Sequence, residues 1–157
     1  MIKGTVFALS ALFLGGTFLA AQEATHFSEK EASKFFPKEL VGYKLKDLKL
    51  KKKSDSWVEY SSTYKTSKKG AKELKLVIND VFPTGKAEWQ DEFAEVTDKI
   101  SDHKVKEVKA DDKHTVMVLV GDRFRVDFKS RQISPEKLRA MAEAYDYKAI
   151  AAVKTLP

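Results

Sequence analysis

Alternating hydrophobic and polar residues predict β-strands over much of this chain. The pattern is found in 41–50, 57–64, 74–82, 103–109 and 123–129, and a nearly continuous apolar run over 115–120 predicts a central strand covered on both faces. The alternation slips between Leu45 and Leu48, which indicates a bulge, and it is weakest in 103–109, where the apolar residues are three apart. Polar turn residues lie between 57–64 and 74–82, and the pair Gly121-Asp122 divides 115–129. The segments 57–64 and 74–82 are therefore predicted to form one β-hairpin, and the two halves of 115–129 are predicted to form another.

Apolar residues at helical spacing predict two main helices and a short N-terminal one. The stripe Trp89, Phe93, Val96 and Ile100 indicates a helix over 86–100. A second helix is expected to begin after Ser134, because Pro135 at the first helical position follows a residue type that caps helices. The short helix is predicted over 28–36, between a capping-box pair (Ser28 and Glu31) and a proline (Pro37).

Together these elements predict an α+β domain. We expect an antiparallel β-sheet of about five or six strands, with the two main helices packed on it and the short N-terminal helix beside them. Residues 22–157 form a single domain in this interpretation, because no linker or low-complexity tract divides them.

The first 21 residues have the pattern of a secretory signal peptide. Lys3 precedes an uncharged apolar run from Val6 to Ala21, and Gln22-Glu23 follows it. We expect cleavage after Ala21, with Ala20 as the next choice, and a periplasmic or secreted location. The alternatives are an uncleaved anchor or a buried helix, but the run is shorter than the ~20 residues that a membrane-spanning helix needs.

The amino-acid composition excludes several kinds of catalytic and metal-binding site and argues against one class of partner. The chain has 157 residues and no cysteine, which excludes thiolate nucleophiles, disulfides and cysteine metal centres. Its net charge is +6, carried by 29 lysines and arginines against 23 acids. Only four of the 29 cations are arginine, the residue type on which base recognition depends most, so a nucleic acid partner is not expected.

No catalytic or metal-binding motif is found, so we predict a protein that is not an enzyme and uses no cofactor or metal. The three histidines, His26, His103 and His114, lack metal-ligand spacing, and no nucleophile or phosphate-loop signature occurs. An envelope hydrolase stays open as an alternative. It would require a cleft that joins His103 or His114 to a buried carboxylate.

Lysines gather in the region of the first predicted hairpin. Residues 42–75 contain eleven lysines and four acids, a local charge of +7. One interpretation is that this region contacts an anionic partner or membrane surface, through Lys51, Lys52, Lys53, Lys68 and Lys69. The other is that these lysines keep exposed edge strands soluble and unpaired.

Aromatic residues in the same hairpin are the second candidate binding feature. Alternation places Tyr60 and Tyr64 on one face of their strand and Trp57 on the other. One set is explained by core packing, and the other would form an exposed contact surface. The pattern leaves open which set is exposed.

The C-terminal third of the chain resembles small exported bacterial proteins of uncharacterised function. The residues that carry this resemblance are Val118-Leu119-Val120-Gly121-Asp122-Arg123-Phe124-Arg125-Val126, followed by Ser134 to Val153, which contains a helix and the end Tyr145-Asp146 with Ile150. It covers about a quarter of the chain. The order of elements is also loosely similar to the PsbP-like α+β sandwich, whose members are mostly non-catalytic accessory proteins. This similarity concerns the fold alone.

The sequence therefore predicts a non-catalytic, exported accessory or binding protein of the bacterial cell envelope. Its partner would be an envelope protein or an anionic envelope surface, with peripheral membrane contact, and its oligomeric state is left open. The alternative is a periplasmic carrier of a small amphipathic or anionic ligand, held in a pocket between sheet and helices.

Overall fold

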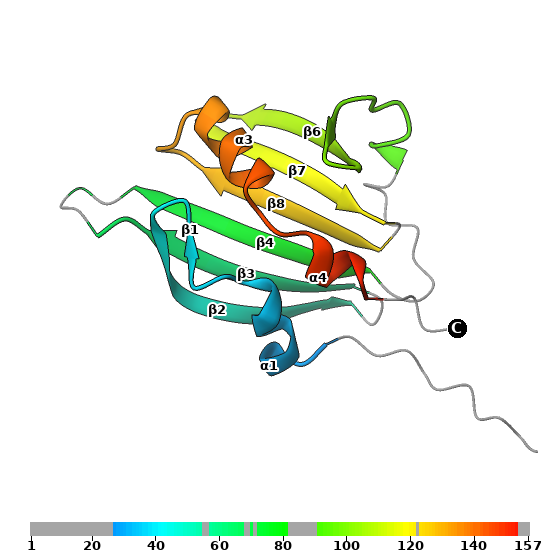
Figure 1. Cartoon of the computed structure of the whole chain (residues 1–157), viewed down its shortest axis with the longest axis horizontal. Coiled ribbons are helices and arrows are strands. Elements are labelled where there is room, and N and C mark those ends of the chain that lie inside the picture. Colours follow the sequence, from blue (N-terminus) through cyan, green and yellow to red (C-terminus); the bar gives the residue numbers. More distant parts are fainter. Residues whose placement is uncertain are drawn as a thin grey trace, which may run out of the picture.

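The computed structural model describes residues 27–153, except 55–56, 68–69, 71, 82–90 and 122. Eight antiparallel strands form one curled sheet in the order β1-β2-β3-β4-β8-β7-β6-β5 (Figure 1). The strands are β1 (Glu39–Leu40), β2 (Tyr43–Ser54), β3 (Trp57–Lys65), β4 (Glu73–Val81), β5 (Lys99–Ile100), β6 (His103–Ala110), β7 (Lys113–Val120) and β8 (Phe124–Ser130). The predicted signal peptide of residues 1–21 lies outside the described residues.

The fold class predicted from the sequence is wrong. The described chain is a β-rich half-barrel with few short helices, in place of an α+β sandwich with five or six strands and two main helices. Two of the additional strands, β1 and β5, have two residues each, which is too short to show a period of alternation. The PsbP-like sandwich expected from the order of elements is corrected by the same finding.

The predicted hairpins are confirmed. Strands β3 and β4 pair along their whole length, from Trp57 opposite Val81 to Lys65 opposite Glu73. Strands β7 and β8 pair from His114 opposite Ser130 to Val120 opposite Phe124. Strand β8 also pairs with β4, so the two hairpins are joined into one sheet. The register of β2 shifts between Leu45 and Asp47, where the sequence predicts a bulge.

The described helices cover one face of the sheet and form the core with it (Figure 1). They are α1 (Glu29–Ala32), the 3₁₀ turn η1 (Ser33–Phe35), α3 (Pro135–Glu143) and α4 (Lys148–Ala151). The capping box of Ser28 and Glu31 starts α1, and Ser134 with Pro135 starts α3, as predicted. In the described part of the chain, no helix has the length and apolar character needed to cross a membrane.

Tyrosine hydroxyls tie the N-terminal segment to this core. Tyr64 on β3 donates a hydrogen bond to the carbonyl oxygen of Pro37, at 2.8 Å. Tyr145, just after α3, donates one to the carbonyl oxygen of Phe35. Both tyrosines are buried, so each hydroxyl satisfies a backbone acceptor that would otherwise be desolvated without a partner.

The helix predicted over 86–100 is not formed beyond Asp91. Residues 82–90 lie outside the described part, Asp91 is helical, and turns follow from Glu92. The ammonium group of Lys104 on β6 donates hydrogen bonds to the carbonyl oxygens of Phe93 (2.7 Å) and Ala94 (3.1 Å). The backbone N–H of Val96 also donates to the carbonyl oxygen of Phe93, at 3.2 Å, so the bonds in this segment span three residues, as in tight turns, and not the four of an α-helix.

Candidate anion-binding face

The face of the sheet opposite the helices is rich in lysine. Val77, Met117 and Asp127 lie side by side in the register and point to this face. Because side chains alternate between the two faces along a strand, every second residue from these three, and the residues paired with them on the other strands, belong to the same face. We call it the basic face, and its cationic members are Lys44, Lys49, Lys51, Lys53, Lys65, Lys75, Lys99, Lys104, Lys106, Lys113, Arg125 and Lys129. Its acidic strand residues are Glu39, Asp47, Glu59, Glu73 and Asp127. Twelve cations against five acids leave an excess of seven positive charges on the described strand residues of this face.

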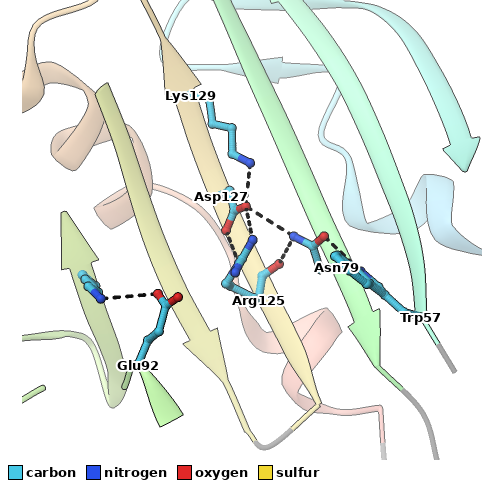
Figure 2. Close-up of polar contacts among 7 residues, drawn as sticks. Trp57, Asn79, Glu92, Arg125, Asp127 and Lys129 are labelled. Carbon is cyan, nitrogen blue, oxygen red and sulfur yellow. Dashed lines mark hydrogen bonds and ion pairs between the residues drawn. The ribbon is translucent and has the colours of Figure 1, made fainter. Parts of the chain in front are cut away.

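A buried acid lies near the centre of the basic face (Figure 2). The carboxylate of Asp127 is fully buried and accepts hydrogen bonds from Arg125 Nε (2.8 Å) and Arg125 Nη2 (3.1 Å). Lys129 Nζ lies 2.8 Å from the same carboxylate, and Asn79 Nδ2 donates to it at 3.3 Å. One negative charge therefore holds two positive ones, so this cluster keeps one net positive charge on the face.

Trp57 extends the cluster toward the β2 edge. Its indole N–H donates to Asn79 Oδ1 at 3.3 Å, which fixes the amide orientation that lets Asn79 donate to Asp127 (Figure 2). Lys53 lies over the indole ring, 5.9 Å from its centroid, and forms an ion pair with Glu59 at 3.1 Å. The half-buried Trp57 is thus held within a polar network and keeps part of its ring accessible.

The structure separates the binding residues predicted from the sequence. Lys51, Lys53 and Trp57 belong to the basic face, and Lys51 is exposed there. Lys68 and Lys69 lie outside the described residues, and so does the side chain of Lys52. Of the three aromatic residues predicted to bind, only Trp57 keeps part of its side chain accessible, which answers the question that the alternation left open.

Tyr60 and Tyr64 belong to the other face and are fully buried in the core. Tyr60 donates its hydroxyl to the carbonyl oxygen of Phe27 at 2.7 Å. Burial raises the pKa of both tyrosines well above the ordinary value of 10.0, because the phenolate would lose its hydration. The structure therefore places these two of the predicted binding residues in the core, away from the basic face.

An open pocket of about 510 Å³ lies at one end of the basic face. It is lined by Glu73, Lys75, Lys113, Lys129, Ser130, Arg131 and Gln132. Four of these seven residues are cationic and one is acidic. The sequence analysis did not single out any of them, since they come from three separated segments of the chain, which only the pairing of β4, β8 and β7 brings together. The signal that could have found Lys129 is the charged face of the strand 123–129.

The histidines of the described chain lie apart. His103 begins β6, while His114 lies opposite Lys109 near the other end of the same hairpin. The ring of His103 packs 5.2 Å from that of Tyr147. The two fully buried carboxylates on the described strands, Asp80 and Asp127, are bound by arginines, and no described histidine contacts them. No group of three metal-ligating side chains occurs among the described residues.

Comparisons with protein-family models, curated proteins and solved structures found no match to this chain. The arguments below therefore rest on its own residues.

Proposed function

We propose that the protein is a non-catalytic, exported binding protein of the bacterial cell envelope, and that its basic face contacts an anionic envelope surface. The observation that carries this proposal is the division of the sheet. One face is buried under helices, while the other has an excess of seven positive charges. Export is proposed on the signal-peptide pattern of residues 1–21.

The distribution of charge favours an extended anionic surface as the partner. Cations occur on all six long strands, from Lys49 on β2 to Lys106 on β6, so the positive field covers the width of the sheet. Lys44, Lys49 and Lys51 are exposed on β2 and can reach a surface without moving the backbone. Each lysine near an anionic membrane surface contributes ~1 kcal/mol to binding.

Sedimentation with vesicles tests the proposal. We expect the wild-type protein to bind vesicles that contain phosphatidylglycerol and to dissociate from them as the salt concentration is raised. It should not bind vesicles of phosphatidylcholine alone. The variant Lys44→Gln/Lys49→Gln/Lys51→Gln should bind ~100-fold more weakly, because three contributions of ~1 kcal/mol are lost.

The matched control removes three lysines from the opposite side of the molecule. Lys30 and Lys34 belong to the N-terminal helical segment and Lys148 to α4, and all three are exposed. Their replacement by Gln changes the net charge by the same amount and should leave vesicle binding within about threefold of the wild type. Equal losses in the two triple variants would refute the assignment to the basic face. Absence of wild-type binding at low salt would refute the function itself.

A further inference from the structure

We propose that the pocket at the end of the basic face binds a phosphomonoester group. The inference rests on the proposed function, because the pocket belongs to the same face, and it adds a specific ligand chemistry at one place. Lys75, Lys113 and Lys129 reach the pocket from three adjacent strands, β4, β7 and β8. Lys75 lies directly opposite Lys129 in the register, and Lys129 lies opposite Thr115, two residues after Lys113.

The charge of the pocket matches a doubly charged anion. Three of its charged residues already have ion-pair partners: Lys129 pairs with Asp127 (2.8 Å), which it shares with Arg125, while Arg131 pairs with Asp112 (3.2 Å) and Glu73 with Lys65 (3.1 Å). Among the described residues, no carboxylate forms an ion pair with Lys75 or Lys113. Two uncompensated ammonium groups thus line one pocket. A phosphomonoester carries ≈ −1.5 to −2 charges at pH 7, which balances them.

Hydrogen bonds hold the wall of the pocket in place. Ser130 Oγ donates to the carbonyl oxygen of Glu73 (2.6 Å) and accepts from the backbone N–H groups of Gln132 (3.1 Å) and Ile133 (3.2 Å). The side-chain oxygen of Gln132 accepts from the backbone N–H of Glu73 at 3.0 Å. This bond uses only the oxygen of the Gln132 amide, whose NH₂ group is a donor suited to a phosphate oxygen. The turn after β8 is therefore tied to the start of β4 before any ligand enters.

The size of the pocket accommodates more than the phosphate. Ligand pockets typically have volumes of about 300–1,000 Å³, and this one, at about 510 Å³, lies within that range. The pocket is also open, so the organic part of an ester can extend out of it. Two sources supply such a group: a soluble phosphate ester, or a lipid whose headgroup ends in a phosphomonoester.

Titration calorimetry with glycerol 3-phosphate and sedimentation with vesicles that contain phosphatidic acid test the two sources. We expect saturable binding of at least one of them by the wild-type protein. The variant Lys75→Gln/Lys113→Gln should weaken that binding by about tenfold or more, because it removes both uncompensated charges. The matched control is Lys30→Gln/Lys34→Gln, which removes two exposed lysines of the N-terminal helical segment, away from the basic face, and should change the affinity by less than about threefold.

The outcomes separate the sources and the two proposals. Binding of glycerol 3-phosphate supports the pocket and a soluble ester. A preference for phosphatidic acid over phosphatidylglycerol, lost only in the pocket variant, supports the pocket and a lipid headgroup. Equal weakening by both pairs, or no binding in either assay, overturns the pocket inference. Failure of the proposed function would appear separately, as absent binding to phosphatidylglycerol vesicles.

Discussion

Asp80 and Arg123 form a bidentate ion pair inside the helix-covered half of the protein. Arg123 Nε lies 2.6 Å from Asp80 Oδ1, and Arg123 Nη2 lies 2.9 Å from Asp80 Oδ2. Both residues are buried, and the guanidinium group lies over the rings of Phe27 and Phe124, at 5.3 and 4.8 Å from their centroids. The pair therefore joins β4, the residue before β8 and the first described residues of the chain.

Removal of Arg123 should be strongly destabilising, because it leaves the buried Asp80 without its arginine. We expect Arg123→Met to lower the free energy of unfolding by about 3–5 kcal/mol, measured by urea denaturation. Arg123→Lys, which keeps the charge but cannot form the bidentate contact, should lie between this variant and the wild type. In Asp80→Leu/Arg123→Met the loss should be smaller than the sum of the two single losses. Additive losses would show that the two residues do not stabilise the protein as a pair.

A second prediction concerns the acid of the basic face. Asp127→Asn removes the carboxylate that holds Arg125 and Lys129, so the free energy of unfolding should fall by about 1–3 kcal/mol. The cost stays moderate because both cations are partly exposed and can be hydrated again. The same variant adds one net positive charge to the face and should raise the affinity for phosphatidylglycerol vesicles by about fivefold.

Asp47→Asn is the matched control, since Asp47 is an exposed acid on the same face. It should raise vesicle affinity to a similar degree and leave stability within about 1 kcal/mol of the wild type. If Asp127→Asn left the affinity unchanged while Asp47→Asn raised it, the centre of the face would not take part in binding.

The long strands could be predicted from the sequence because alternation records which side of each strand is buried. The pattern fails where a residue lies just outside a strand. Alternation groups Arg123 with Arg125 on the polar face, yet Arg123 precedes β8 and its side chain turns into the core to meet Asp80. The helical pattern also fails in 92–100, where an apolar stripe is present but no helix forms. Lys104, which lies outside the predicted helix, donates to the carbonyl oxygens of Phe93 and Ala94.

The candidate site was predictable only in part. A local excess of lysine identified Lys51, and the alternation placed Trp57 apart from the two tyrosines, but neither feature says that β4, β7 and β8 bring more cations to the same face. In the sequence Asp127 has the pattern of a solvated acid between basic neighbours, yet it is fully buried and accepts a hydrogen bond from Asn79, 48 residues earlier. Contacts of that range are set by strand order, which local patterns do not contain.

His103 should make stability depend on pH. Burial lowers the pKa of His103 below its ordinary value of 6.5, and the nearby carboxylate of Asp102 opposes this only in part. Because the folded protein binds this proton more weakly than the unfolded chain, the contribution of His103 is full above pH 6.5. It is lost as the pH falls from there through the lowered folded pKa.

The measurement is urea denaturation across this range. The free energy of unfolding should decrease from about pH 7 to about pH 5, and His103→Gln should show a smaller decrease over the same interval. An identical pH dependence in the wild type and the variant would exclude His103 as its source.

The turn at Phe93 should depend on a single ammonium group. Lys104 Nζ bonds two carbonyl oxygens of this turn, and Phe93 is buried beneath it, so Lys104→Met should free the turn while keeping the apolar stem of the side chain. We expect a loss of about 1–3 kcal/mol in the free energy of unfolding and faster amide hydrogen exchange in residues 92–98. Lys106→Met is the control, because Lys106 forms only a partly exposed ion pair with Glu92 at 3.3 Å, and its loss should cost at most about 1 kcal/mol. Exchange that accelerates equally in both variants would mean that the general positive charge of β6, and not the two bonds of Lys104, holds the turn against the sheet.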